Sequence, residues 1–507
     1  MVTDNGLAEL HNGQARGRPE VLLFCLLLLC YAYFVPRWAD WNQNARFDLT
    51  LAMVEERSFS IDSYYANTGD YAVFRGRHYA GKAPGTSFLA VPSNMLFKGF
   101  LSLPGIRQQL QARAGNAAFQ STLREGGSGL QANKVEFAAG LYVSTLFTVG
   151  VPAALLWVLV FRFLRRYSQQ VRWRLLAVLG LGLGTLAFPY ASVLYGHVPS
   201  AFLLFTAFYL LVQIRREERS THYLWLVGFL LGFAVITEFP TALGAGVLFC
   251  YAASSLRGRR GLAQIVAGAL PPAMLLAFYN YACYGSPFTT GYRYLALFPQ
   301  QAQSSLLGFS LPRWHALWGI TFSSFRGLFF SSPFLLLTVP GCWFLWRRRE
   351  WRAECVASIC LVGAYVVLIS GWDDWQGGFA VAGPRHLIPA LPFMALPVLA
   401  AFEAARARIW LRRVVAALLA LSLVVVFIQV AGGQDFAPAE VRNPLVDFFW
   451  PRFLAGDINR NLGMVLHLPR WYSLAPLVVA GTALLMGLLV GERRRSWIPA
   501  RESIARN

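Results

Sequence analysis

Long apolar runs separated by short Arg-rich turns are the feature of this 507-residue sequence that most restricts its fold. A hydrocarbon core of about 30 Å takes roughly 20 apolar residues of helix. Twelve segments meet this requirement: 20–36, 137–164, 175–193, 197–214, 223–238, 240–256, 262–282, 327–346, 354–371, 387–405, 414–431 and 472–491. We therefore expect an all-α polytopic membrane protein with about 12 transmembrane helices.

The composition excludes other classes of protein. Charged residues make up 14% of the chain, against roughly 25% in a soluble domain. The net charge of +20 could suggest a nucleic-acid partner, but the Arg residues gather in the turns between apolar segments. This distribution is a topology signal, and we expect no nucleic acid. The seven cysteines form no CxxC motif and are read as apolar filler.

The basic residues also predict the orientation. Segment 86–103 is short and contains Pro92 and Lys98, so it is read as re-entrant or interfacial. With twelve spans, one side of the membrane then carries 26 basic and 10 acidic residues, and the other 19 and 15. Positive residues favour the cytoplasm. We expect a multi-pass protein of the inner (plasma) membrane.

This topology divides the chain into three parts. The tail 1–19 and the basic tail 492–507 are expected to be cytoplasmic, and the membrane domain covers 20–491. All the long loops fall on the outer side, and the first of them, 37–136, is the largest. We therefore expect any chemistry at the outer face.

The first outer loop mixes acids and bases beside an apolar segment. ARFDLTLAMVEE has apolar residues at helical spacing, which suits a helix on the membrane surface. The stretch from Asp62 through Asp70 to Lys82 follows it, and YAVFRGRHYAG could form a turn or short hairpin around Gly76. Such a stretch could pair a general base with phosphate-binding cations, or it could be a solvated loop with surface ion pairs.

RFDLTLAMVEE followed by GRHYAGKAPGTSFLAVP resembles the first outer loop of the GT-C superfamily of membrane glycosyltransferases. The nearest groups are the lipid A aminoarabinose transferases and the protein O-mannosyltransferases. The matching positions are Arg46, Tyr79, Lys82 and Pro84. Four later pieces also resemble bacterial members, so that the resemblance covers residues 20–400: GHVPSAFLLF, GSPFTTGYRY, SSFRGLFFSSP and WDDWQGGFAVAGPRHLIPALP.

The resemblance implies an inverting enzyme that moves a sugar from a polyprenyl phosphate to an acceptor on the non-cytoplasmic side. The acceptor is a lipid, a polysaccharide or a protein. An acidic residue would take the acceptor proton, and Arg, Lys or a divalent cation such as Mg²⁺ or Mn²⁺ would offset charge on the leaving phosphate. The chain departs from the family at Gln43, where an acid usually stands. We therefore expect Asp70 as the base, Asp62 second and Asp40 third.

Other outer residues are candidates for substrate binding. His197, Arg293, Arg326 and Arg385 join Arg46, Tyr79 and Lys82 in this set. Basic residues are disfavoured on the outer side, so we predict that Lys82, Arg293 and Arg385 converge on one cavity. Each also has a plain structural reading as an interface anchor or a clamp. Asp373 and Asp374 could hold a metal ion or lie in a loop at headgroup level.

Two other classes of function remain open. Twelve spans also fit a membrane transporter or lipid flippase, although the two halves look unlike and the charges gather on the outer side. The chain could also be a non-catalytic envelope assembly factor, because the usual acid is replaced by Gln43.

Overall fold

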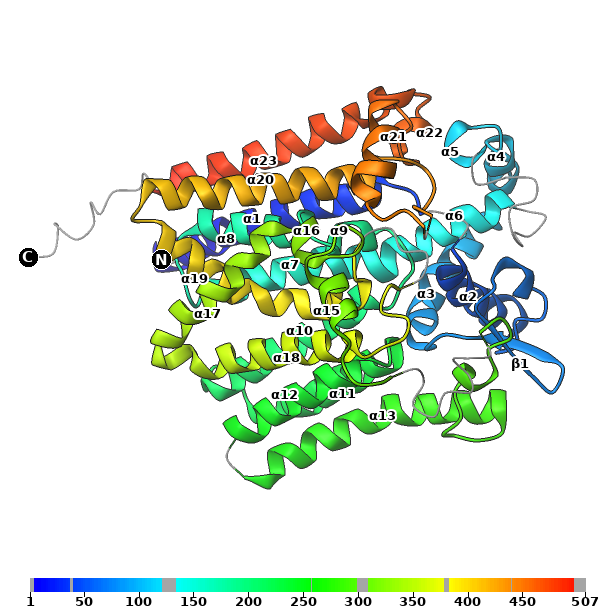
Figure 1. The fold of residues 1–507 in the computed structure, drawn as a ribbon, viewed down its shortest axis with the longest axis horizontal. Coiled ribbons are helices and arrows are strands. Elements are labelled where there is room, and N and C mark those ends of the chain that lie inside the picture. The colour runs from blue at the N-terminus through cyan, green and yellow to red at the C-terminus, as the bar shows by residue number, and fades with distance from the viewer. Residues whose placement is uncertain are drawn as a thin grey trace, which may run out of the picture.

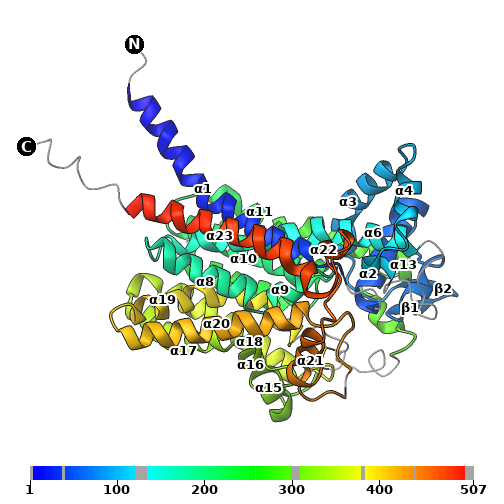
Figure 2. The same cartoon turned by 90° about the horizontal axis from the view of Figure 1, so that it is seen from above.

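The computed structural model describes residues 4–36, 40–120, 134–256, 258–298, 309–377, 383–438 and 440–496. Long, roughly parallel helices form a bundle, and a lobe of short helices and one β-hairpin lies at one end of it (Figure 1). The start of α1 (Asp4–Tyr33) and the end of α23 (Ala475–Ser496) lie at the opposite end. The view from above shows the same separation (Figure 2). Which end faces the cytoplasm stays a prediction.

Seven helical segments in the described part of the chain are long and apolar enough to cross a membrane. They are Lys134–Leu164 (α6, η3 and α7), His197–Arg215 (α10), Arg259–Tyr284 (α13), Arg349–Ser370 (η7 and α18), Arg385–Ala405 (η8 and α19), Ile409–Ala431 (α20) and Arg470–Val490 (η10 and most of α23). Three shorter apolar helices join them: Pro19–Tyr33 in α1, Thr221–Thr237 (η4 and α11) and Thr241–Ser255 (α12). A polytopic helical protein is therefore the right class.

The two remaining predicted spans are broken. Segment 175–193 is divided between α8 (Val171–Leu183) and α9 (Ala187–Tyr190), and 327–346 is divided among α16 (Leu328–Ser331), η6 (Pro333–Leu337) and α17 (Thr338–Arg347). Pro333 lacks an amide proton and therefore starts a new helix rather than continuing α16. The count of twelve crossings stays a prediction.

The centre of the bundle is formed by η8 with α19 and by α10. Of the apolar window in Arg385–Ala405, 89% is buried inside the protein, against 17% for α13 at the edge. Arg385 is the first residue of η8 and His197 the first residue of α10, so both side chains start from largely buried elements.

The peripheral helix α13 packs against α11 (Leu224–Thr237) backbone to backbone. A Cβ atom at Gly228 would collide with the carbonyl oxygen of Ile265, and one at Gly268 with that of Trp225. Small residues permit this close approach of two membrane helices. The segment GFLLG, residues 228–232, is therefore a packing motif.

The first outer loop begins with α2 (Trp41–Leu51), which continues into the short π-helix η1 (Ala52–Glu56). Asp40 caps α2, because its side chain accepts a hydrogen bond of 3.0 Å from the backbone amide of Asn42. The predicted helix is present, but its predicted place on the membrane surface is wrong. Every residue from Asn42 to Leu51 is buried. The polar side chains of α2 find partners within the protein, so the helix needs no contact with water.

A β-hairpin follows, as the spacing around Gly76 predicts. Strand β1 (Tyr71–Phe74) pairs antiparallel with β2 (Arg77–Ala80). The turn residues Arg75 and Gly76 both have positive φ, 49° and 76°, the geometry that suits a two-residue hairpin. At the open end of the hairpin the amide of Gly81 donates to the carbonyl of Asp70 at 2.8 Å. Asp70 and Lys82 therefore lie next to each other at the open end of the hairpin.

Segment 86–103 forms the 17-residue helix α3 (Gly85–Leu101) with Pro92 inside it. Its far half exposes large apolar side chains, among them Met95, Leu96 and Phe100. An exposed apolar face on a helix of the lobe is compatible with the predicted interfacial position, which stays a prediction.

The other described elements are short connections between these parts. They are η2 (Tyr65–Asn67), α4 (Ile106–Ala112), α5 (Ala117–Gln120), η5 (Gly291–Tyr294), α15 (Trp314–Thr321), η9 (Leu445–Phe449), α21 (Trp450–Leu454) and α22 (Leu462–Val465).

Candidate active site

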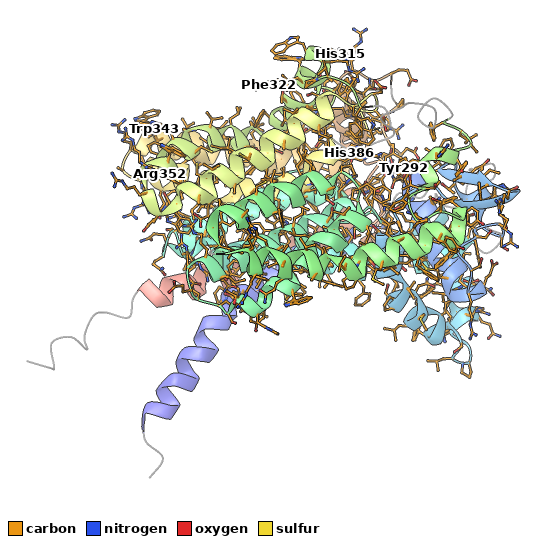
Figure 3. The ribbon with its side chains drawn as sticks, turned by 90° about the horizontal axis from the view of Figure 1, so that it is seen from below. Tyr292, His315, Phe322, Trp343, Arg352 and His386 are labelled. Carbon is orange, nitrogen blue, oxygen red and sulfur yellow. The ribbon has the colours of Figure 1, made fainter. Side chains whose placement is uncertain are left out.

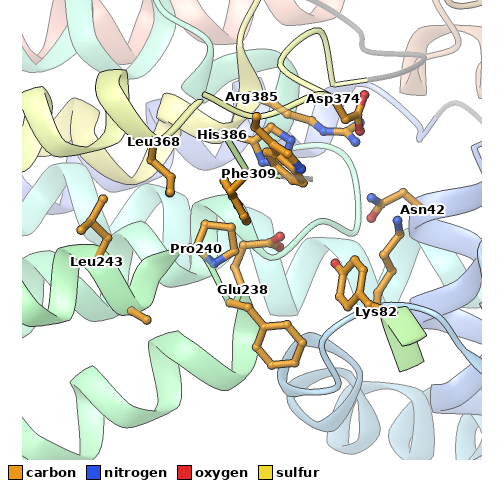
Figure 4. A pocket seen from close by; sticks show the side chains of 14 residues that line it. Asn42, Lys82, Glu238, Pro240, Leu243, Phe309, Leu368, Asp374, Arg385 and His386 are labelled. Atoms are coloured by element: carbon orange, nitrogen blue, oxygen red, sulfur yellow. The ribbon is translucent and has the colours of Figure 1, made fainter. Parts of the chain in front are cut away.

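A cavity of about 310 Å³ lies where the lobe meets the bundle (Figure 4). It is lined by Asn42, Lys82, Glu238, Phe239, Pro240, Ala242, Leu243, Tyr292, Phe309, Leu368, Trp372, Asp374, Arg385 and His386. Figure 4 shows Lys82 and Asn42 on the side of the lobe, and Leu243 and Leu368 on the side of the bundle. The cavity is therefore charged at one end and apolar at the other.

Lys82 supplies a positive charge to this cavity. Its Nζ lies 3.1 Å from Asp70 Oδ2 and 5.9 Å from the ring centre of Tyr292. Burial opposes the charge of Lys82, but attraction to Asp70 and to Tyr292 outweighs it, so the pKa of the ammonium group is raised. Lys82 is thus held charged beside a buried carboxylate that is only 7% exposed.

Arg385 supplies a second positive charge from the opposite wall. Its Nη1 donates to the hydroxyl of Tyr195 at 3.3 Å, and that hydroxyl in turn donates to Asp40 Oδ2. The Nε atom of Arg385 is buried and has no hydrogen-bond partner among the described residues. Arg385 therefore keeps a donor available to a ligand in the cavity.

Asp40, at the end of this chain of contacts, has an unusual acidity. Burial raises the pKa of its carboxyl group to about 6, although the hydrogen bond from Tyr195 and the charge of Arg385 act in the opposite direction. The negative charge of Asp70 contributes to the rise. A carboxylate with this pKa is suited to accept a proton near neutral pH.

Arg46 has a different place from the one predicted. Its Nη2 donates to Glu238 Oε2 at 2.9 Å, Nη1 to the carbonyl of Ala83 at 3.2 Å and to Thr86 Oγ1 at 3.1 Å, and Nε to Asn42 Oδ1 at 3.1 Å. The side chain is 1% exposed and does not line the cavity. Arg46 therefore ties α2 to α3 and to the turn after α11, and it positions Glu238 in the cavity wall.

His197 and His386 lie next to each other beside Glu238. Their ring centres are 4.9 Å apart, and His197 Nδ1 lies 3.8 Å from Glu238 Oε2. One ligand atom from each of the three residues falls within 4.8 Å of the other two. Figure 3 shows His386 and Tyr292 near the junction of lobe and bundle, whereas Trp343 and Arg352 lie at the far end. This set of donors could hold a metal ion.

Of the residues predicted for catalysis or substrate binding, only Lys82 and Arg385 line the cavity. Arg46, His197, Asp40 and Asp70 lie behind its wall, and four others have different surroundings. Asp62 Oδ1 accepts hydrogen bonds from the backbone amide of His78 at 2.7 Å and pairs with its ring at 2.9 Å, and its side chain is 46% exposed. Tyr79 is buried against Tyr284, with ring centres 5.4 Å apart. Arg293 is exposed, while Arg326 is buried over the ring of Phe325.

The predicted convergence therefore holds for Lys82 and Arg385 and not for Arg293. Its neighbour Tyr292 lines the cavity instead, because the short helix η5 turns the two side chains in different directions. Asp373 and Asp374 have different surroundings: Asp373 pairs with Arg313 at 2.8 Å, and Asp374 faces the cavity. A metal ion held by the two acids stays a prediction.

Sequence reasoning missed Tyr195, Tyr292 and His386 as members of the site. The signals were weak but present. Tyr195 stands two residues before His197, Tyr292 precedes Arg293, and His386 follows Arg385. For Glu238 the signal is its position between two apolar segments, where a carboxylate rarely lacks a role.

No family model matches the chain, and no curated protein does. Among solved structures, the fold is similar to the crystal structure of ArnT from Cupriavidus metallidurans bound to undecaprenyl phosphate. The TM-score is 0.48 and the identity 13%, over 97% of this chain and 76% of that chain.

Proposed function

We propose that the chain is a glycosyltransferase of the inner membrane that moves a sugar from a polyprenyl phosphate to an acceptor on the non-cytoplasmic side. The observation that carries the proposal is the two-ended cavity. Its apolar end, with Leu243 and Leu368, suits a lipid chain, and its cationic end, with Lys82 and Arg385, suits a phosphate.

The chemistry follows from the same groups. The acceptor oxygen attacks the anomeric carbon and forms the new C–O bond, while the bond from that carbon to the phosphate oxygen breaks. The electron pair leaves with the lipid phosphate, where Lys82 and Arg385 offset the charge. The hydroxyl proton passes to a carboxylate. One displacement inverts the configuration at the anomeric carbon.

Asp70 is the proposed base, because it is the buried carboxylate held 3.1 Å from the cavity-lining Lys82. Asp40 is the second choice, on the strength of its raised pKa of about 6. Asp62 falls behind both, since its side chain is 46% exposed and paired with His78.

Mass spectrometry of co-purified lipid tests the donor class. The chain is purified in mild detergent, and its bound lipid is compared with that of the double variant Lys82→Met/Arg385→Met. Polyprenyl phosphate or its glycosylated form should be enriched with the wild type only. A lipid profile that is identical in the two preparations would reject the donor site.

Turnover is tested separately. Purified chain is incubated with a panel of polyprenyl-phosphate monosaccharides and an envelope extract as acceptor, and the release of free polyprenyl phosphate is measured. A lipid flippase would bind the same donors but leave the sugar–phosphate bond intact, so that outcome would replace the transferase by the flippase.

A further inference from the structure

We propose that His197, Glu238 and His386 form a binding site for a transition-metal ion of the zinc type in the wall of the cavity. One donor atom from each residue lies within 4.8 Å of the other two. All three side chains are buried, with exposed fractions of 1%, 6% and 5%. Two imidazoles with one carboxylate are a donor set that zinc uses in catalytic sites, where three protein ligands leave a further position open.

The unsatisfied histidine nitrogens point to a missing ligand. Both ring nitrogens of His386, and Nδ1 of His197, are buried without a hydrogen-bond partner among the described residues. Buried polar atoms are almost always paired, and leaving one unpaired costs about 1–3 kcal/mol. A metal ion would use one nitrogen of each ring and remove most of this cost.

The three residues come from three rigid elements. His197 begins α10, His386 lies at the start of η8, and Glu238 follows the last residue of α11. A zinc ion with bonds of about 2.0–2.2 Å places its ligand atoms roughly 3.4 Å apart. Side-chain rotations that move the ligand atoms by about an ångström would therefore bring them to bonding distance without moving a helix.

The surroundings resemble those of a bound metal in two respects. Glu238 is oriented by Arg46 through a hydrogen bond of 2.9 Å, and ligating carboxylates are usually held in this way. Glu238 and His386 also line the cavity, as Lys82 and Arg385 do, so an ion held by these residues would lie at the wall of a space that also contains two cations. With cations on both sides, an anion such as phosphate is the natural fourth ligand.

The donor set decides which metal fits. Imidazole nitrogen favours Zn²⁺ over Mg²⁺ or Ca²⁺, which prefer oxygen ligands. Contact of the ion with the donor phosphate rests on the proposed function. Binding of the ion itself does not, and it can be measured on the resting protein.

The experiment uses the full chain, purified through a tag that contains no histidine and is then removed. After treatment with a chelator, the protein is titrated with ZnCl₂ by calorimetry and with CoCl₂ by visible absorption, which reports the coordination geometry. Bound metal is counted by mass spectrometry after desalting. We expect the wild type to bind one ion per chain. In His386→Ala the affinity for the ion should fall by at least about 10–100-fold, because losing a mere hydrogen-bond partner of a ligand already costs that much.

His386→Ala is the decisive variant, because its ring nitrogens bond to no described residue and its loss leaves the Arg46–Glu238 pair intact. His222→Ala is the matched control, since His222 is exposed on the turn before α11 and should change nothing. The melting temperature of each variant checks that it is folded.

Wild-type chain that retains no Zn²⁺ or Co²⁺ would overturn the site, as would equal affinity in wild type and His386→Ala. The histidines would then be part of a cluster of aromatic rings in edge-on and tilted contact. It includes Tyr195, whose ring centre is 5.8 Å from that of His197, and Trp372, whose ring centre is 4.6 Å from that of His386. A chain that binds one Zn²⁺ but releases no polyprenyl phosphate would keep the metal site and reject the proposed function. Sugar transfer by a chain that binds no metal would keep the proposed function and reject the metal site.

Discussion

Arg46 Nη2 and Glu238 Oε2 lie 2.9 Å apart in the protein interior, although 192 positions separate the two residues in the chain. The pair joins the first outer loop to the end of α11, and each partner is nearly excluded from water. Since charges in such a place are costly when left alone, the pair fixes how the lobe sits on the bundle.

Removing the guanidinium should therefore unfold this junction more easily. We expect Arg46→Ala to lower the free energy of unfolding by about 3–5 kcal/mol, the usual cost of breaking a buried ion pair. The melting temperature in detergent measures it. Arg107→Ala is the control, because Arg107 makes a comparable pair with Glu136 at 3.3 Å but is 55% exposed. Its loss should cost at most about 1 kcal/mol, and equal shifts in both variants would contradict the structural role of Arg46.

Lys82 and Arg385 should govern affinity for the donor lipid. Replacing either by Met removes one charge-assisted contact to phosphate, worth about 1.5–3 kcal/mol, or roughly 10- to 100-fold in affinity. Binding of polyprenyl phosphate to chain in nanodiscs is the measurement. Arg293→Met provides the comparison, since Arg293 is an exposed basic residue outside the cavity. Equal losses in all three variants would indicate a general charge effect instead of a shared phosphate site.

Asp70 should govern turnover rather than binding. Asp70→Asn keeps the size of the side chain and removes the base, so transfer should fall by about 10²–10⁴-fold while the lipid remains bound. Asp62→Asn should stay near the wild-type rate, because Asp62 lies in the hairpin and pairs with His78. If Asp40→Asn alone stops the reaction, the role passes from Asp70 to Asp40.

Asp40 should make stability depend on pH. The pKa of its carboxyl group is raised from 3.8 to about 6 in the folded chain, so the folded state holds this proton more tightly than the unfolded state. The resulting stabilisation is fully present below about pH 4 and is lost as the pH rises through about 6. Asp40→Asn stays neutral, and above pH 7 it should exceed the wild type by roughly 3 kcal/mol or less.

Asp62 gives the opposite sign and serves as the control for Asp40. Burial alone would raise the pKa of Asp62, but hydrogen bonds from Ser60 and His78 lower it below the usual value. Asp62→Asn should therefore lose stability at neutral pH and match the wild type in acid. Melting curves of both variants between about pH 2 and pH 8 decide, because the contribution of Asp62 is lost only below about pH 4. Parallel curves for wild type and Asp40→Asn would refute the shifted acidity of Asp40.

Cysteine labelling tests the orientation. In a background without the seven native cysteines, Gln109→Cys in the exposed helix α4 should react with an impermeant reagent from outside. Arg219→Cys, in the turn between α10 and η4, should react only after the membrane is opened. The inverse labelling pattern would contradict the predicted orientation.

Helix positions were largely predictable, because apolar runs of span length and the hairpin turn at Gly76 are local signals. The burial of α2 inside the protein was not predictable from such local signals. A helix with Asn42, Arg46 and Asp48 looks like a surface helix until its partners from α3 and the end of α11 are known. The burial of α2 depends on residues that lie up to 192 positions away.

Some residues of the candidate site were predictable from the sequence, and others were not. Lys82 and Arg385 could be found from their charge on the disfavoured side of the membrane. Tyr292 could not, since a short helical turn decides whether residue 292 or 293 faces inward. His386 was hidden by Arg385 beside it, and its role depends on His197 and Glu238 from two other helices.

The contact between α11 and α13 limits how this chain can vary. Under random mutagenesis, the lipid-facing residues of α13, such as Met274 and Phe278, would accept exchange for other apolar types, because most of their surface meets only solvent or acyl chains. Gly228 and Gly268 would accept no exchange, because any added carbon would meet backbone. The least buried of the seven spans would thus carry one of the least replaceable positions, Gly268, opposite Gly228 on α11. A mutational map would mark the seam between the two helices as one isolated intolerant position on each of them.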